Sequence, residues 1–571
     1  MLPCVIFEDE HLLVVHKPPG WNTHAPSPYA GEGIYDWLRY REPRWSKLAI
    51  IHRLDKETSG VIVFSKSAAA NRSLTEQFTQ REVRKKYVLL TEHQPLRKQL
   101  TVKNCLVRAG EKYVSRPLHA GGDVAETRFE FKGKRAEPGN ERNPSPWPSP
   151  HRMGRGNSPN VGCYEVIAEP LTGRTHQIRA HAAEAGFPIL GDALYGGTVA
   201  ARVYLHATEL RLRHPATKEV VSFRAPIDFG ADARVSLRTA FIEPGLTNAY
   251  RLIHGASDGW PGLYVDKLGD HLLSQSESGL TSEQETELLR LMEINNARGV
   301  YHKTLTRHTR QTAVTNASPR LAAGEPAPER FVVRENGLHF ELSFSEGYSV
   351  GLFLDQRDNR RRLMSGEVAT GIALPWAGML APPAAGAAGT PRATTAATIE
   401  VLNAFAYTCG FSVCAAKAGA RTTSIDLSKK YLEWGKRNFE LNGCDSGQHD
   451  FIYGDVLDWF RRLAKKQRLF DVILVDPPTF SQSKETGIFR VEKDYSKLMG
   501  LAIPLLKRGG VLLASTNAAD WAPEEFLKTI EIAICDSKRK ILQREYFPQP
   551  PDFPVSRAEP AYLKTVWLRI E

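Results

Sequence analysis

The chain has 571 residues, roughly four times the length of a typical domain, so several domains with sizeable cores are expected. It carries 75 Lys and Arg against 64 Asp and Glu, and the resulting net charge of +11 makes a polyanion the first partner to consider. With 42% hydrophobic and 24% charged residues, the composition is that of a globular protein. The length excludes a single small binding module, and the composition argues against a disordered, collagen-like or membrane protein.

The cysteine pattern and the amino-terminal residues bear on the compartment. The seven cysteines are scattered and include no CxxC pair, so neither a metal site nor a secreted disulfide framework is expected. The first residues are acidic where an export signal would be basic. One uncharged stretch, 369–391, is rich in Ala, Gly and Pro, and we interpret it as a loop rather than a membrane span. These features predict a cytoplasmic protein.

In chain order, short runs of β-branched residues predict a sheet-dominated, mixed α+β domain at 1–228, interrupted by a Pro-rich insertion at 133–160. Residues 229–345 are expected to form a small α+β central domain. Buried-strand runs then alternate with helical patterns, so 346–571 is predicted to be an α/β doubly wound, Rossmann-like domain. An Ala-, Gly- and Pro-rich segment at 371–398 is a second expected insertion. Neither insertion is expected to carry chemistry.

A first candidate site is the segment HRLDKETSG at 52–60. Its Asp55 lies between Arg53 and Lys56 and is followed by small turn-forming residues, which can present a carboxylate in a cleft. The flanking cations should keep Asp55 ionised, as a nucleophile must be, and should attract phosphates. A surface loop with solvated charges is the alternative interpretation.

A second basic segment lies at 171–197. It begins as a Gly-containing turn and continues as a predicted helix that gathers Arg174, His176, Arg179 and His181. Such a cluster of cations is costly unless an anion binds there.

HRLDKETSG and GRTHQIRAH, in this order and with RKKYVLL between them, resemble the RluA-type pseudouridine synthases, and the resemblance extends over residues 5–228. It implies that Asp55 attacks the target uridine without any cofactor and that Arg179 pairs with this aspartate. Tyr87 would stack on the flipped base and help to remove the C5 proton, although a plain core aromatic is the alternative. Arg53 would fill the gap left by the flipped base. His52, Arg174 and His176 would contact the RNA substrate.

The third candidate site begins at the strand-like run ending in Asn403, which turns through Tyr407 into a helix, while Asp426 closes the next strand. Doubly wound sheets hold nucleoside cofactors with such a turn and such a carboxylate. NAD would fit equally, but the turn lacks GxGxxG, which disfavours a pyrophosphate. Asp455 and Asp476 follow the next two strands, and four ligand-type residues at four strand ends indicate a methyltransferase.

Residues 245–571 resemble the class I S-adenosylmethionine-dependent rRNA methyltransferases of the RlmI and RlmK kind, through RLIHGASDGWPGLYVDKLGD, GLFLDQRDNR and VDPPTF. The resemblance implies S-adenosylmethionine as cofactor, with Asp355, Gln356 and Arg357 closing over the site and Asp476 also acting in catalysis. The implied cofactor contacts are Asn403, Tyr407, Asp426, Asp455, Asp476 and Pro477, and the implied substrate contacts are Arg357, Pro478 and Thr479.

The methylated atom is predicted from the cysteines. Methylation of cytosine C5 needs a Cys nucleophile near the fourth or fifth strand, and DPPTFSQSK and LLASTNAADW contain none. We therefore favour a guanine nitrogen, whose lone pair attacks the methyl group directly. The sequence thus predicts a bifunctional enzyme acting on rRNA or tRNA. Cytosine C5 methylation, or a chain in which only one half is active and the other binds RNA or assists ribosome assembly, are the alternatives.

Overall fold

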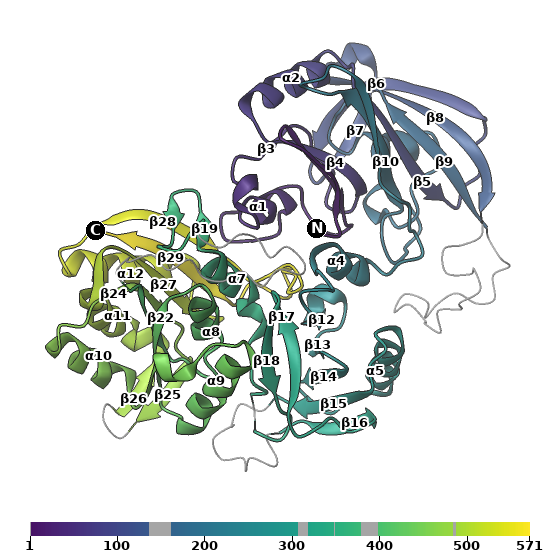
Figure 1. The fold of residues 1–571 in the computed structure, drawn as a ribbon. Coiled ribbons are helices and arrows are strands. Elements are labelled where there is room, and N and C mark those ends of the chain that lie inside the picture. Colours follow the sequence, from purple (N-terminus) through teal and green to yellow (C-terminus); the bar gives the residue numbers. More distant parts are fainter. Residues whose placement is uncertain (1, 136–161, 306–317, 348, 379–397, 484–486) are drawn as a thin grey trace. The chain divides into compact units, whose positions relative to one another are not determined.

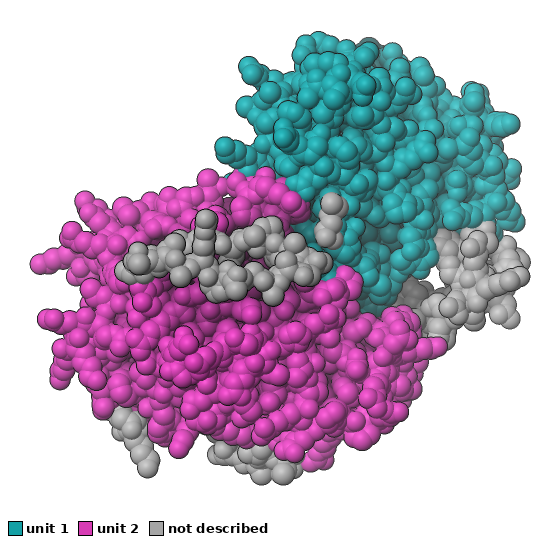
Figure 2. Space-filling model, viewed as in Figure 1, with its two compact units in different colours: residues 1–26, 32–39, 47–243 teal, residues 27–31, 40–46, 244–571 magenta. Residues whose placement is uncertain are grey.

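The computed structural model describes residues 2–135, 162–305, 318–347, 349–378, 398–483 and 487–571. The chain divides into two compact units, coloured separately in Figure 2. Unit 1 comprises residues 1–26, 32–39 and 47–243, and unit 2 comprises residues 27–31, 40–46 and 244–571. Across these described ranges, no helix has both the length and the apolar character that a membrane crossing requires.

Unit 1 is built on one large sheet, shown in purple to blue in Figure 1. In the described residues its order is β1-β2-β4-β10-β5-β9-β8-β6-β7, with β3 on β4 and β11 on β10. Its strands are β1 (Val5–Glu8), β2 (Leu12–Lys17), β3 (Ala49–Ile50), β4 (Ser59–Ser65), β5 (Arg84–Thr91), β6 (Gln99–Ala109), β7 (Lys112–Arg116), β8 (Asp123–Arg135), β9 (Cys163–Pro170), β10 (Leu205–Arg213) and β11 (Val220–Arg224). Its helices are α1 (Ile34–Arg39), α2 (Ala68–Thr79), α3 (Gln177–Glu184) and α4 (Ala233–Phe241).

The centre of this sheet is the trio β4, β10 and β5. Every residue of β4 is buried, as its sequence SGVIVFS leads one to expect for a central strand. β10 pairs in parallel with β4 and antiparallel with β5, so that Ala207 faces both Gly60 and Tyr87. A Cβ on Gly60 would lie 2.2 Å from the carbonyl oxygen of Ala207, and its φ of +122° also requires glycine. Glycine there lets β4 lie close to the backbone of β10.

Unit 2 contains a sheet of order β12-β13-β14-β15-β16, the hairpins β17-β18, β19-β20 and β25-β26, and a sheet of order β23-β22-β21-β24-β27-β29-β28. The strands of the smaller elements are β12 (Ala249–His254), β13 (Leu263–Leu268), β14 (His271–Ser276), β15 (Gly299–Thr304), β16 (Arg320–Gly324), β17 (Phe331–Glu335), β18 (Leu338–Leu342), β19 (Glu367–Ala369), β20 (Ile372–Ala373), β25 (Phe480–Ser483) and β26 (Gly487–Arg490). The last sheet consists of β21 (Glu400–Ala404), β22 (Arg421–Asp426), β23 (Asp450–Tyr453), β24 (Phe470–Val475), β27 (Leu506–Thr516), β28 (Ile541–Phe547) and β29 (Lys564–Ile570). The helices are α5 (Ser282–Ile294), α7 (Arg357–Ser365), α8 (Gly410–Lys417), α9 (Lys429–Leu441), α10 (Val456–Lys465), α11 (Val491–Ala502) and α12 (Pro523–Asp536).

The last sheet is covered by helices on both faces, and its strands supply alternate side chains to two cores. Val401, Val472 and Leu474 pack with residues of α8 and α9 on one face. Leu402 and Ile473 pack with residues of α10, α11 and α12 on the other. The described strands of this sheet pair in parallel except at β29, which runs antiparallel to both β27 and β28. The strand order reverses between β21 and β24, and ligands of doubly wound sheets bind at the carboxyl ends of strands at such a point.

The predicted fold class is confirmed: a multidomain chain with a sheet-dominated α+β part, a small α+β sheet and a doubly wound α/β sheet. The boundaries at residues 228 and 345 stay predictions. Most of the predicted insertions, 136–160 and 379–397, lies outside the described residues. The start of the second insertion is not a loop, however, because it contains β20, and Ile372 and Trp376 are fully buried. The Trp376 indole donates to the Leu363 carbonyl at 2.8 Å, which anchors this segment on α7.

Candidate active sites

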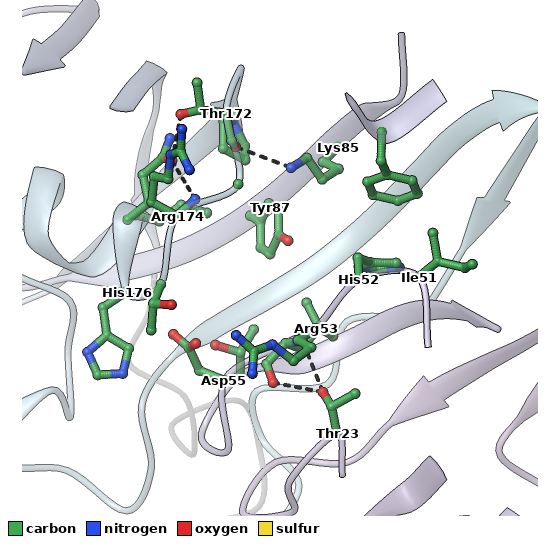
Figure 3. Close-up of a pocket in the computed structure, with 18 of the residues that line it drawn as sticks. Thr23, Ile51, His52, Arg53, Asp55, Lys85, Tyr87, Thr172, Arg174 and His176 are labelled. Carbon is green, nitrogen blue, oxygen red and sulfur yellow. Dashed lines mark hydrogen bonds between the residues drawn. The ribbon is translucent and has the colours of Figure 1, made fainter. Parts of the chain in front are cut away.

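A cavity of about 930 Å³ in unit 1 contains most of the predicted synthase residues. The loop 50–58, the strand β5 and the segment from the end of β9 into α3 form its wall, and Figure 3 shows their side chains converging on it. The cavity brings together Asp55, Tyr87, Arg179, Arg53, His52, Arg174 and His176. Residues far apart in the sequence thus meet in one site. The volume of this cavity lies within the 300–1,000 Å³ typical of ligand pockets.

The loop that carries Asp55 is fixed through its backbone. The Thr23 hydroxyl donates to the Leu54 carbonyl at 2.9 Å and accepts from the Leu54 amide at 3.0 Å. The ammonium of buried Lys17 donates to the Lys56 carbonyl at 3.1 Å, and the Thr58 amide donates to the Asp55 carbonyl at 3.1 Å. Because none of these bonds uses the Asp55 carboxylate, that group remains available to the cavity.

The Asp55 carboxylate pairs with Arg179 rather than with its neighbours in the sequence. Arg179 Nη1 lies 3.8 Å from Asp55 Oδ2 and 3.6 Å from Glu57 Oε2. The same guanidinium donates two hydrogen bonds to Asp192, from Nε at 2.6 Å and from Nη2 at 2.8 Å. Asp192 is fully buried, so its bidentate pair sets the orientation in which Arg179 faces Asp55.

The electrostatic setting of Asp55 differs from the expectation. Burial raises the pKa of Asp55, while His176 and Arg179 act in the opposite direction. A quarter of its side-chain surface still faces the solvent-filled cavity, so water screens part of this burial. The expected source of ionisation was wrong: Arg53 is exposed at the cavity wall, and Lys56 pairs with Glu32 at 3.3 Å. The charges that oppose protonation of Asp55 are those of His176 and Arg179, at the start of α3, and of Lys17 on β2.

Tyr87 lies on β5 and is buried in the protein. Its ring forms part of the cavity wall (Figure 3). Burial, and then the Asp55 charge, raise the pKa of its phenol above the usual range. The hydroxyl therefore stays protonated at neutral pH. It can donate a hydrogen bond or stack through its ring, and it cannot be a resident phenolate base.

The three predicted substrate residues occupy different parts of the wall. The His52 ring stacks on Phe78 at 4.9 Å and accepts from the Val63 amide at 3.2 Å, and burial lowers the pKa of His52 to about 3. His176 lies just before α3 in the left-handed region, hydrogen-bonded to the Tyr195 hydroxyl at 3.0 Å. Arg174 pairs with Asp123 at 3.2 Å near the surface.

His181 corrects the predicted cationic cluster. Its ring nitrogens bond to Thr127 at 2.8 Å and Asn104 at 2.9 Å, and it is fully buried outside the cavity wall. Burial lowers the pKa of His181 to about 4, so it is a neutral core residue. The helix begins later than expected, at Gln177, which is why this face turns inward.

Sequence reasoning missed Asp192, Glu57 and Lys85, all of which act on or line this cavity. Glu57 and Lys85 lie inside the motifs HRLDKETSG and RKKYVLL, so their place in the sequence could have indicated that they lie near the site. The only sequence signal for Asp192 was its place in the Gly-rich turn that follows α3.

In unit 2, the turn after β21 has an unusual backbone. Phe405, Tyr407 and Cys409 all have positive φ, at 59°, 49° and 63°. Each such non-glycine residue costs on the order of 1–3 kcal/mol and persists only where the surroundings impose it. The turn directs the Tyr407 amide onto Asp426 Oδ2 at 2.8 Å, and the Ser428 amide donates to Asp426 Oδ1 at 2.8 Å. A recessed carboxylate thus lies at the carboxyl end of β22, next to the point where the strand order reverses.

Asp476 follows β24 on the other side of this point. Its Oδ2 accepts from the Gln356 amide at 3.0 Å, and the same amide donates to the Ser515 hydroxyl at 2.9 Å. Burial, and then the charge of Asp355, raise the pKa of Asp476 to about 7. Asp355 in turn accepts from the Tyr562 hydroxyl at 2.9 Å. The predicted closure by residues 355 and 356 therefore has a counterpart in contacts around Asp476.

The other predicted residues of this site are placed as follows. Asn403 is buried and donates to Ser412 at 2.9 Å, and Asp455 caps α10 through the Asp458 amide at 3.0 Å. Pro477 is buried, whereas Pro478 and Thr479 are exposed after β24.

Arg357 is the exception among them. Its guanidinium is buried and donates to both oxygens of Asp552, at 2.9 Å and 2.5 Å. The predicted substrate contact is therefore replaced by a structural ion pair, because Asp552, 195 residues away in the chain, neutralises the arginine inside the protein.

The residues at these strand ends suit a nucleoside cofactor with a cationic group. Asp426 offers a carboxylate already oriented by two amides, and this carboxylate can accept hydrogen bonds from ribose hydroxyls. No group of three or more His, Cys, Asp or Glu side chains suited to a metal ion occurs in the ranges that the structure describes.

Comparison with known proteins assigns two parts of the chain to families. Residues 11–184 match the family model of RNA pseudouridylate synthases, and residues 391–569 match that of S-adenosylmethionine-dependent methyltransferases. The ribosomal RNA large subunit methyltransferase of Deinococcus radiodurans is 31% identical over 352 residues, which cover 60% of this chain and 78% of that protein. The chain belongs to the ribosomal RNA large subunit methyltransferase family. It also carries an RNA pseudouridylate synthase domain at residues 11–184.

Two further relatives are similar. Ribosomal RNA large subunit methyltransferase I of Aeromonas salmonicida is 31% identical, covering 57% of this chain and 75% of that protein. Ribosomal RNA large subunit methyltransferase K/L of a Psychrobacter species is 36% identical over 222 residues, covering 38% of this chain and 23% of that protein. Both predicted families are thereby confirmed, and the chain combines a pseudouridine synthase with an S-adenosylmethionine-dependent methyltransferase. The 930 Å³ cavity lies in the first match and its flank, and the reversal point of the sheet in the second.

Proposed function

We propose that this ribosomal RNA large subunit methyltransferase family member is a bifunctional RNA-modifying enzyme whose first half isomerises uridine through Asp55, with no cofactor. The observation that carries the proposal is the Asp55 carboxylate facing the cavity, 3.8 Å from Arg179 and in the same cavity wall as Tyr87. Asp55 attacks C1′ of the target uridine, so that a bond from its carboxylate oxygen to C1′ forms as the bond between N1 and C1′ breaks. The base rotates, and C5 attacks C1′ and displaces the Asp55 carboxylate. C5 then loses its proton and N1 gains one, so that the product is an isomer of the substrate and Asp55 is regenerated.

The remaining synthase residues have supporting roles in this proposal. Arg179 holds Asp55 as a carboxylate, and Tyr87 stacks on the extruded base as a neutral phenol. Arg53, exposed at the cavity wall, fills the space that the base leaves in the RNA. His52, Arg174 and His176 shape the wall around the nucleotide.

Tritium release from RNA labelled at uridine C5 tests this assignment. Asp55→Asn should abolish release while leaving methyl transfer from labelled S-adenosylmethionine intact. Glu130→Gln is the matched control, because Glu130 is an acid of the same unit that pairs with Lys132 and is absent from the cavity wall. Release that persists in Asp55→Asn would show that the nucleophile lies elsewhere.

For the second half, we propose methyl transfer from S-adenosylmethionine to a guanine nitrogen. The cofactor supplies an electrophilic methyl group, and Asn403, Tyr407, Asp426, Asp455, Asp476 and Pro477 would hold it at the strand ends. Pro478 and Thr479, exposed beside Asp476, would then meet the base.

The cysteines support nitrogen over cytosine C5. Cys409 and Cys414, the two nearest the turn, are buried, and burial raises the pKa of Cys409 to about 12 and that of Cys414 higher. Neither is a thiolate at neutral pH, so neither is suited to attack a pyrimidine ring. A covalent adduct with RNA containing 5-fluorocytosine would overturn this conclusion, and methylguanine in digested product RNA would support it.

Large-subunit ribosomal RNA is the proposed substrate of both halves, since the relatives are named for that RNA. The net charge of +11 supports a polyanionic substrate. The scattered cysteines, without a disulfide framework, support a cytoplasmic location as part of the proposal. Mapping pseudouridine and methyl groups on total RNA, with and without this protein, tests the proposal. Marks lost from tRNA rather than rRNA would refute it.

A further inference from the structure

Lys85 is a half-buried cation of the synthase cavity, and no acid of the described residues neutralises it. Lys85 lies on β5, two residues before Tyr87, and its ammonium donates to the Thr172 carbonyl at 3.2 Å (Figure 3). No carboxylate in the described ranges forms an ion pair with it. An ammonium has three N–H donors and no acceptor, so one carbonyl leaves most of its capacity unused.

Three other cations of the cavity wall form ion pairs with acids. Arg179 is held by Asp192, Lys56 by Glu32 and Arg174 by Asp123. Lys85 is half-buried, whereas Arg53 and Arg81, which also line the cavity and form no ion pair in the described ranges, are exposed to solvent. Burying an unpaired charge is costly, and such a group is retained where a ligand brings the compensating charge.

The position of Lys85 within the cavity indicates which part of a ligand it meets. Figure 3 shows it beyond Tyr87 from Asp55, beside His52 and the loop 172–174. Gly173 carries no side chain to cover it, and a Cβ there would lie 3.4 Å from the ammonium. A cavity of about 930 Å³ has room at this end for part of a neighbouring nucleotide.

We propose that Lys85 and the loop 172–174 form an anion subsite that binds a backbone phosphate of RNA next to the flipped uridine. This inference rests on the proposed synthase function. Uracil and ribose are neutral, and the phosphodiester is the one anionic group that RNA presents. The subsite would fix the register of the strand while Asp55 acts at the other end of the cavity.

Burial lowers the pKa of Lys85 to about 8. A bound phosphate raises it again, so RNA affinity should fall as pH rises through 8 in the wild type. Lys85→Met should remove that fall.

The decisive test is the salt dependence of RNA binding. We expect Lys85→Met to weaken binding of a single-stranded RNA oligonucleotide about tenfold at low salt. It should also reduce the slope of log K against log[salt] by about 0.7, the value for one lost phosphate contact. Tritium release should show a raised KM with kcat nearly unchanged, and Lys85→Arg should restore both binding and slope.

Lys86→Met is the matched control. Lys86 is the next residue on the same strand, points to the opposite face and pairs with Glu169 at 3.8 Å. It should leave the slope unchanged. An unaltered slope in Lys85→Met, or an equal change in Lys86→Met, would overturn the subsite. If Lys85→Met does not fold, Lys85→Gln with the same salt series gives the same decision.

The two proposals fail in different ways. If the wild type releases tritium but the slope does not depend on Lys85, the subsite is wrong and the synthase assignment stands. If RNA binds with a Lys85-dependent slope but no tritium is released, the isomerase assignment is wrong and the subsite stands.

Discussion

Asp192→Asn tests how Arg179 is held beside Asp55. Asp192 is fully buried and accepts two hydrogen bonds from Arg179, at 2.6 Å and 2.8 Å. The amide keeps one acceptor oxygen, but it removes the negative charge and replaces the second acceptor with a donor. Breaking a buried ion pair costs 3–5 kcal/mol, and with one bond retained we expect about 3 kcal/mol. At about 1.4 kcal/mol per tenfold change, the local opening constant of α3 should rise about a hundredfold.

Native-state hydrogen exchange of the α3 amides measures this constant directly, without treating a two-unit chain as a two-state folder. Asp123→Asn is the matched control. Its pair with Arg174 is at the surface, with 68% of the Asp123 side chain exposed, so its loss should change the exchange by less than 1 kcal/mol. Equal protection in Asp192→Asn and Asp123→Asn would refute the assignment of Asp192 as the residue that holds Arg179.

The same variant has a second readout. Without Asp192, Arg179 is drawn closer to Asp55, and a closer cation lowers the pKa of a carboxyl. Because the proposed nucleophile acts when ionised, activity appears as pH rises through that pKa. The acid limb of the tritium-release profile should therefore move to lower pH in Asp192→Asn, whereas a limb that moves to higher pH would contradict the geometry.

Three further predictions concern other parts of the chain. Burial lowers the pKa of Lys17 to about 7, so the folded state binds its proton less tightly than the unfolded state, and the stability of unit 1 should rise from pH 7 to 10; Lys17→Met should flatten this rise in urea titrations. Burial raises the pKa of Asp476 to about 7, so the folded state binds this proton more tightly than the unfolded state, and the stability of unit 2 should fall as pH rises from 4 to 7. Asp476→Asn should remove this fall in stability and reduce methyl transfer at least tenfold. A Cβ on Gly435 would lie 2.4 Å from Cys409 Sγ, so Gly435→Ala should weaken S-adenosylhomocysteine binding about tenfold, as measured by calorimetry. Adding Cys409→Gly to that variant should restore binding, and Gly500→Ala, where a Cβ meets open space, should have no effect.

Much of the site could be predicted because the reactive residues lie inside short motifs. Asp55, Tyr87 and Arg179 come from three separate segments, and the sheet order brings those segments to one cavity. Likewise, Asp426 ends β22 and Asp476 follows β24, two strands that the sequence predicted. Local patterns of this kind specify which strand a residue ends, and parallel strands then place those ends at one edge.

Partners contributed by distant elements could not be predicted. Arg357 was expected to face the substrate, but Asp552 neutralises it inside the protein. His181 was expected to join a cationic cluster, but Asn104 and Thr127 bind both of its ring nitrogens. Each of these partners lies more than fifty residues away, and no periodicity links it to the residue it binds.

The same distinction explains why Lys85 matters. A motif identifies a charged residue without saying whether the protein neutralises it, and the fold decides that question. Arg357 and Arg179 have buried carboxylates of their own, whereas Lys85 meets one carbonyl and a solvent-filled cavity. Since a buried charge is stable only when something compensates it, a cation that the fold leaves unpaired indicates where the ligand supplies its charge. The test is therefore whether Lys85, unlike Lys86 beside it, accounts for one phosphate in the salt dependence of RNA binding.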